Sequence, residues 1–213
     1  FDKLTGAIWS HISVNRVAYL IILVSIIVGI SVGAGACVSM SGDDYNNMQG
    51  YIVDSVRGLR DTPVNLSQTF QIALLNTLKI SLLLWLFGFT IIGVVAIPII
   101  IGIRSFACGF TVALLIRACG GAGLLAALIG ILPQMMIMLP ALAVFGAISI
   151  RFSTNITFSK VEKKDKWRMI FSYTMFSSIM MLILMLCALI EGYVSPGFLG
   201  IAFLEGNNKA ELE

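Results

Sequence analysis

Few residues in this chain could carry chemistry. His11 is the only histidine, and it precedes the first long apolar run. Hydrolytic triads pair a nucleophile with a buried His, and metal sites need several His, Cys or carboxylate ligands close together. The sequence also lacks the P-loop motif that holds nucleotide phosphates. We therefore expect no catalytic residue, no cofactor and no bound metal.

The cysteines offer no alternative metal site. None belongs to a Cys-x-x-Cys pair or stands at a ligand spacing from His11. All four lie within or at the ends of apolar runs: Cys37, Cys108, Cys119 and Cys187. In such places Cys acts as a small packing residue.

Glu191 is the only acidic residue inside an expected membrane span. A carboxylate within the membrane is costly, so it indicates either a functional site or a specific structural partner. Glu191 also falls near the outer end of its span, where it could reach water or pair with Arg117. The sequence leaves a structural role and a coupling or binding role open.

The pair Pro133-Gln134 interrupts the middle of a long apolar run. Pro133 frees a carbonyl one turn earlier, and the Gln134 amide could satisfy it or bond to another helix. Broken helices also line transport sites. No second copy of this element marks a repeated half, so we favour a kink held by the amide over a transport path.

The elements that position these residues are membrane helices. Of 213 residues, 58% are apolar and 12% are charged, against about 25% charged in soluble proteins. Runs near the required length of about 20 apolar residues cover residues 17–38, 80–103, 105–119, 124–150 and 170–194. We predict an all-α, polytopic integral membrane protein with one domain, residues 1–213. It should have about five transmembrane helices, the third short and the fourth kinked.

Loop charges predict the orientation of these spans, because Lys and Arg in short loops accumulate on the cytoplasmic side. With five crossings and a cytoplasmic N-terminus, nine such residues are cytoplasmic: Lys3, Arg16, Arg104, Arg151, Lys160, Lys163, Lys164, Lys166 and Arg168. Five are outside: Arg57, Arg60, Lys79, Arg117 and Lys209. We therefore expect a cytoplasmic N-terminus and an extracytoplasmic C-terminus.

Four segments flank the spans. Residues 1–16 have apolar side chains at helical spacing and predict a helix on the cytoplasmic membrane surface. Residues 41–79 predict an extracytoplasmic segment with an amphipathic helix, either a plain approach to the next span or a platform for a partner. Residues 151–169 predict a basic cytoplasmic loop that fits anionic lipid better than nucleic acid. Residues 195–213 predict an extracytoplasmic tail.

Small residues recur every fourth position in the first span, at Ser25, Gly29 and Gly33. Such a stripe lets another helix approach closely. The contact could lie within the chain or between two copies of it. We include a homodimer among the expected assemblies.

Four stretches carry a family pattern in their letters, order and spacing. They are Ile92-Gly93 to Pro98 with Arg104 and Gly109-Phe110-Thr111-Val112; Pro133-Gln134 with Pro140-Ala141; Phe152-Ser153; and Glu191-Gly192-Tyr193-Val194-Ser195-Pro196. Together they resemble the stage II sporulation protein M family. The resemblance covers the chain in length and span pattern, and its specific parts are residues 88–153 and 190–196.

That resemblance implies a non-catalytic membrane scaffold used when the mother cell engulfs the forespore. It implies recruitment of two peptidoglycan hydrolases, stage II sporulation proteins D and P, to the septal and engulfing membrane of a bacterial cell. Candidates for partner contact or structure are Gly109, Phe110, Thr111, Pro133, Gln134, Pro140, Glu191, Tyr193, Ser195 and Pro196. The runner-up is a transport or channel subunit that uses Glu191 and the Pro133-Gln134 kink.

Overall fold

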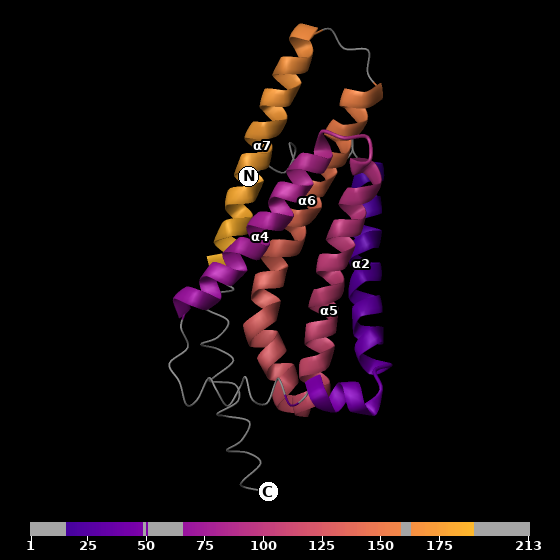
Figure 1. Ribbon diagram of the computed structural model, residues 1–213, viewed down its shortest axis with the longest axis vertical. Helices are drawn as coiled ribbons and strands as arrows, with labels where there is room; N and C mark the ends of the chain where they lie inside the picture. Colours follow the sequence, from indigo (N-terminus) through magenta and orange to yellow (C-terminus); the bar gives the residue numbers. More distant parts are fainter. Residues whose placement is uncertain (1–15, 49, 51–65, 159–162, 190–213) are drawn as a thin grey trace, which may run out of the picture.

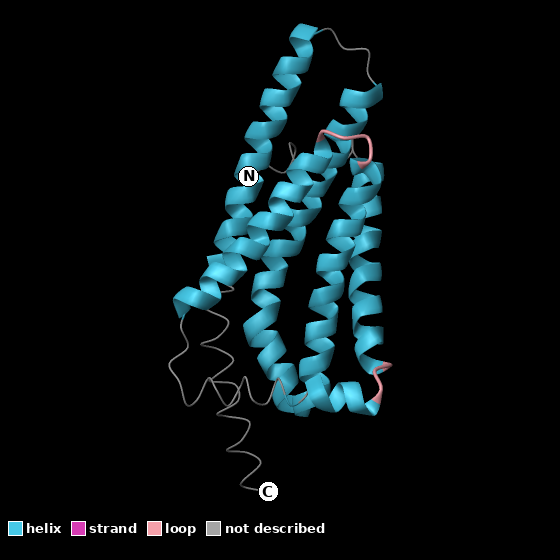
Figure 2. Ribbon diagram, viewed as in Figure 1, coloured by secondary structure: helices cyan, strands magenta, loops and turns pink. Residues whose placement is uncertain are grey.

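The structure is a computed structural model, and it describes residues 16–48, 50, 66–158 and 163–189. Every main element of this part of the chain is a helix, and no strand occurs there (Figures 1 and 2). The elements are α2 (Arg16–Val38), α4 (Leu66–Gly88), α5 (Gly93–Ala126), the π-helix η1 (Ala127–Ile131), α6 (Leu132–Phe158) and α7 (Lys163–Leu189). A short helix also covers residues 42–48.

Five helical stretches are long and apolar enough to cross a membrane. They are Arg16–Val38, Phe70–Gly88, Gly93–Ala118, Gly123–Thr157 and Lys166–Leu189. Many large apolar side chains on these helices are exposed on the outside of the bundle, as a surface that faces lipid requires. The structure thus confirms the predicted all-α membrane fold.

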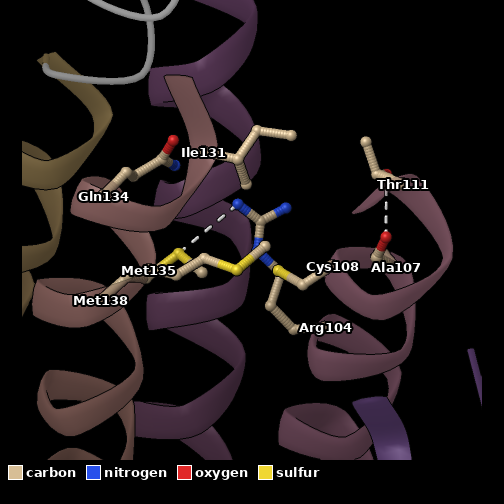
Figure 3. A pocket seen from close by; sticks show the side chains of 8 residues that line it. All are labelled: Arg104, Ala107, Cys108, Thr111, Ile131, Gln134, Met135 and Met138. Atoms are coloured by element: carbon tan, nitrogen blue, oxygen red, sulfur yellow. Dashed lines mark hydrogen bonds between the residues drawn. The ribbon is translucent and has the colours of Figure 1, made fainter. Parts of the chain in front are cut away.

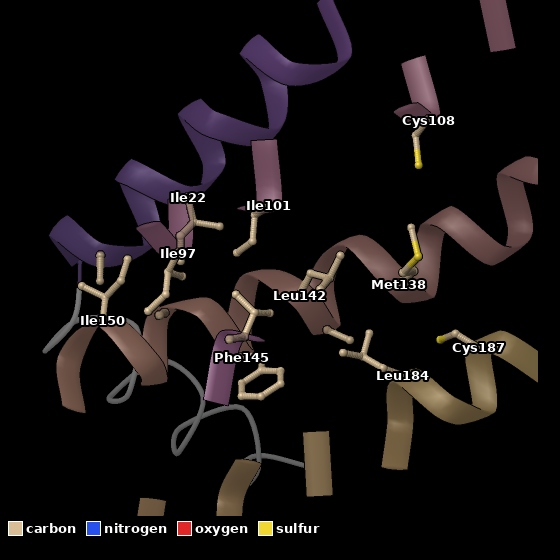
Figure 4. Close-up of a cluster of buried hydrophobic side chains, with 14 residues drawn as sticks. Ile22, Ile97, Ile101, Cys108, Met138, Leu142, Phe145, Ile150, Leu184 and Cys187 are labelled. Atoms are coloured by element: carbon tan, nitrogen blue, oxygen red, sulfur yellow. The ribbon is translucent and has the colours of Figure 1, made fainter. Parts of the chain in front are cut away.

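Helix α6 contributes much of the buried core. It packs against α2, α5, α4 and α7, and Phe145 at its centre is completely buried. Figure 4 shows Leu142 and Phe145 of α6 between Ile97 and Ile101 of α5 and Leu184 of α7. Lipid is as apolar as these side chains, so close van der Waals packing holds the helices together.

Helices α2 and α5 form the most extensive helix pair (Figure 1). A Cβ at Gly29 would meet the carbonyl oxygen of Gly102, and a Cβ at Gly33 would meet the backbone of Phe106. The expected small-residue stripe therefore serves contact within the chain. The Cβ of a residue at position 102 would lie 3.7 Å from the Ser25 carbonyl oxygen, so Ser25 lies at the same seam.

The second and third predicted spans have wrong boundaries. The apolar run over residues 80–103 is divided by a turn after Gly88, and α5 begins at Gly93. The third span is Gly93–Ala118, with 26 residues, and is not short. The sequence does not mark this turn, because the turn carries no charge, whereas Lys79 and Arg104, which stand at the predicted boundaries, lie within spans.

Two cations consequently move into the membrane. Arg104 is not in a cytoplasmic loop but lies inside α5, and Lys79 is not in an outer segment but lies inside the span Phe70–Gly88. The amphipathic helix expected at the end of residues 41–79 is the first half of α4, which continues without a break to Gly88.

The basic loop expected over residues 151–169 is also wrong in extent. Helix α6 runs to Phe158 and α7 starts at Lys163, so most of these residues are helical. The predicted surface helix before Arg16 and the tail after Leu189 lie outside the described residues. The fourth span does depart from regular α-helix, because η1 precedes Pro133 and Pro140 lies inside α6.

Candidate functional site

A cavity of about 190 Å³ lies between α5 and the start of α6 (Figure 3). Its walls combine a charge, an amide and a hydroxyl with sulfur and apolar side chains: Arg104, Ala107, Cys108, Thr111, Ile131, Gln134, Met135 and Met138. The cavity is partly open, with Ala107 and Thr111 exposed, and it places polar groups among apolar ones at the depth of the membrane spans. Polar groups at such depth are costly and therefore indicate a specific role.

Arg104 places a positive charge near the middle of its span. It follows Gly93 by eleven residues, which is about 16 Å along the helix. Its Nη2 lies 3.6 Å from the Sδ atom of Met138 on α6, and its side chain is half-buried. Thioether sulfur is a weak acceptor, and the five described spans contain no Asp or Glu.

Gln134 reaches the same cavity because of the irregular backbone beside it. The π-helix Ala127–Ile131 ends just before Pro133, which has no backbone N–H to donate. A π-segment adds a residue to the turn and often occurs at functional sites. The Gln134 side chain is buried, with 7% of its surface exposed, and Figure 3 shows it beside the cavity that Arg104 enters.

Thr111 lines the cavity two turns beyond Arg104 on α5. Its hydroxyl donates to the Ala107 carbonyl oxygen at 2.8 Å, so it is engaged within its own helix. The structure thus brings together two candidates from separate stretches of the sequence, Thr111 and Gln134, and adds Arg104 between them.

Two further clusters hold the ends of the bundle. Tyr173 of α7 stacks on Phe152 of α6, with ring centroids 4.0 Å apart, and meets Phe89 edge to face. The Ser153 hydroxyl donates to the Thr90 carbonyl oxygen at 2.5 Å. Together they hold the α4–α5 turn against α6 and α7.

At the opposite end, Arg117 joins α5 to the end of α2. It donates to the Cys37 carbonyl oxygen at 2.6 Å. Its guanidinium lies 4.0 Å from the centre of the Tyr45 ring, and the Tyr45 hydroxyl donates to the Arg117 carbonyl oxygen at 2.9 Å. These contacts close the loop that follows α2.

The family model for stage II sporulation protein M matches residues 18–196, most of the chain. The chain belongs to the stage II sporulation protein M family. It is accordingly a sporulation-related membrane protein, and its family is not a known enzyme family. No curated protein and no solved structure matches the chain.

Several residues that carry the family pattern lie at packing positions. A Cβ at Gly109 would collide with the backbone of Ile30, so this glycine lets α2 and α5 touch. Phe110 stacks with Phe106 at 6.1 Å between ring centroids. Pro140 is exposed on α6. The remaining candidates lie outside the described residues: Glu191, Tyr193, Ser195 and Pro196.

Sequence reasoning missed Arg104 as a site residue. The signal that could have revealed it is the pair of glycines at 88 and 93 around Thr90, which permits a tight turn without any charge. Placing the turn there divides the apolar tract into spans of 19 and 26 residues, and Arg104 then falls inside the second one. Among the described residues, no group of three His, Cys, Asp or Glu residues is placed to hold a metal.

Proposed function

We propose that this protein is a non-catalytic membrane scaffold that recruits and anchors peptidoglycan hydrolases at the septal membrane during forespore engulfment. The observation that carries the proposal is the family match over residues 18–196. The proposed partners are the stage II sporulation proteins D and P. The protein would supply location and assembly, and the hydrolases would supply the chemistry.

The use of polar side chains inside the bundle supports this proposal. Tyr173 bonds to Ser149 and to the Trp85 carbonyl oxygen, at 3.1 and 3.0 Å. The Ser81 and Ser105 hydroxyls donate to carbonyl oxygens one turn earlier. These side chains hydrogen-bond to other helices or to backbone carbonyl oxygens of their own helix. Such bonds hold the bundle rigid, as a scaffold requires.

The proposed orientation places the N-terminus in the cytoplasm. When cations near the ends of the observed spans are counted with the nearer side of the membrane, eight Lys and Arg residues fall on that side: Lys3, Arg16, Arg151, Lys160, Lys163, Lys164, Lys166 and Arg168. Four fall outside: Arg57, Arg60, Arg117 and Lys209. The asymmetry survives the transfer of Arg104 and Lys79 into the membrane. Residues 39–65 and 190–213 would then face the cell wall.

The docking segment can be tested by exchange. Residues 46–65 are replaced by a Gly/Ser sequence of equal length, which keeps the Tyr45 contact to Arg117. We expect the variant to insert and fold normally but to retain neither hydrolase. The matched control replaces residues 197–213 in the same way, which keeps the candidate residues Ser195 and Pro196, and it should retain both hydrolases. Retention of both hydrolases by the first variant would remove residues 46–65 as the docking segment.

The runner-up function is a transport or channel subunit, and the cavity between α5 and α6 favours it. A charged cavity beside a π-segment is the kind of feature that transport sites use. In liposomes this function predicts solute or proton flux that falls in Arg104→Gln and Glu191→Gln. A sealed membrane with both hydrolases bound would exclude it.

A further inference from the structure

Helix α4 carries two polar residues on its exposed face at the middle of a membrane span. Lys79 is nine residues from each end of the span Phe70–Gly88, or about 13.5 Å along the helix from either end. Asn76 lies one turn earlier, and both side chains are exposed. The rest of this face is apolar and exposed: Ile72, Leu75, Leu82, Leu83 and Leu86.

The bundle itself does not use this face. The side of α4 that packs inward holds Ala73, Thr77, Ser81 and Leu84, all buried. Lys79 is two positions from both Thr77 and Ser81 and therefore points away from the helices that they contact. Within the described residues, no hydrogen bond or ion pair engages the Lys79 ammonium or the Asn76 amide.

Lipid alone is a poor environment for these two side chains. A charge at the centre of a span is costly, and an amide without a partner there is costly too. A Lys side chain extends about 6 Å toward water, which is less than half of the path along the helix from Lys79 to either end of the span. A protein surface that supplies a negative charge would satisfy both groups.

The charges of the bundle limit what that surface can be. The five described spans contain no Asp or Glu, and Glu191 is expected near the outer end of its span. A second copy packed through these spans would therefore bring no carboxylate to the depth of Lys79, at the middle of its span. We propose that Lys79 and Asn76 dock a transmembrane helix of another protein that carries a carboxylate at mid-span. The proposal extends the scaffold function, on which it rests for the place of that helix in a larger assembly.

A model helix tests the recognition without the hydrolases. The full chain is reconstituted in phosphatidylcholine vesicles with a labelled polyleucine transmembrane peptide that carries one central Glu, or Gln in its place. Energy transfer from protein to peptide measures binding. We expect the Glu peptide to bind about tenfold more tightly than the Gln peptide, as one interhelical polar contact allows.

Variants of Lys79 test whether this face causes the preference for the Glu peptide over the Gln peptide. Lys79→Met should abolish the preference, and Lys79→Arg should retain it. Lys79→Glu should instead bind a peptide with a central Lys more tightly. Arg104→Gln is the matched control, because it removes a cation near the middle of another span, on α5, and it should leave the preference unchanged.

Three results would overturn the proposal. One is equal binding of the Glu and Gln peptides. Another is a preference that persists in Lys79→Met or disappears in Arg104→Gln. The third is self-association of the chain that Lys79→Met abolishes, since this would place a second copy on the face. Failure of the peptide test leaves hydrolase retention as a separate result, because the vesicles contain no hydrolase.

Discussion

Arg117 on α5 donates to the carbonyl oxygen of Cys37 at 2.6 Å, across eighty residues of sequence. Cys37 is completely buried at the end of α2, where the last carbonyls of a helix lack partners within it. The same guanidinium lies over the Tyr45 ring. One side chain thus satisfies the end of α2 and fixes the start of the loop that follows.

Replacing Arg117 should loosen this end of the bundle. We expect Arg117→Met to lower the free energy of unfolding by about 1–2 kcal/mol, from one charged hydrogen bond and one cation–π contact at a partly exposed site. Thermal unfolding in detergent measures the change. Arg168→Met is the control, because Arg168 is exposed on α7 and should tolerate the change. Equal stability of the two variants would contradict the role of Arg117.

A side chain added at one glycine of α2 should destabilise the contact between α2 and α5, and a side chain added at another glycine should not. A Cβ at Gly33 would meet the backbone of Phe106 and Phe110, which cannot move aside, whereas a Cβ at Gly35 meets nothing within 4 Å. We expect Gly33→Leu to cost about 3 kcal/mol by overpacking and Gly35→Leu to be nearly neutral. Thermal unfolding of both variants in detergent measures the two effects. Unchanged stability of Gly33→Leu would contradict the close contact between α2 and α5 at Gly33.

Gly120 is the one described residue with a positive φ, at 55°. It bends the end of α5, and a Cβ there would touch nothing within 4 Å. The cost of Gly120→Ala is therefore backbone strain alone, about 1 kcal/mol. Gly121→Ala, next to it in open space, should be neutral or slightly stabilising. Equal effects of the two changes in a thermal melt would argue against the bend.

The Tyr173 hydroxyl and the Tyr173 ring should make separable contributions. Tyr173→Phe keeps the stacking on Phe152 but loses the bonds to Ser149 and to the Trp85 carbonyl oxygen. We expect a loss of about 1 kcal/mol for Tyr173→Phe and about 3–4 kcal/mol for Tyr173→Ala, which also leaves a void. Unfolding of purified protein measures both, and similar losses would show that the ring contributes little.

Sequence reasoning placed the first and last spans well. Arg16 precedes one continuous apolar run, and the expected residues 17–38 agree with α2 (Arg16–Val38). The last span follows a cluster of cations in the same way, although α7 already starts at Lys163. Apolar runs with charged flanks identify a span directly, because both ends meet water.

The central spans could not be placed in the same way. The turn after Gly88 has no charged residue, and it is held by Phe89 packing on Tyr173 and by Ser153, sixty-three residues from Thr90. Such contacts arise only once the helices have packed. Arg104 and Lys79 lie inside helices and do not end them. Span boundaries predicted at these charges are therefore wrong, and both residues are then assigned to loops. The sequence for this reason predicted neither the cavity beside Arg104 nor the polar residues on the exposed face of α4.

The most direct test of the scaffold function is copurification. The protein is solubilised in mild detergent from sporulating cells of its source, purified through an affinity tag and probed for the stage II sporulation proteins D and P. Gly35→Leu serves as a folded control. The scaffold account predicts that both hydrolases remain bound to wild-type protein and to this control. Purified, folded protein from engulfing cells that carries neither hydrolase would contradict the account.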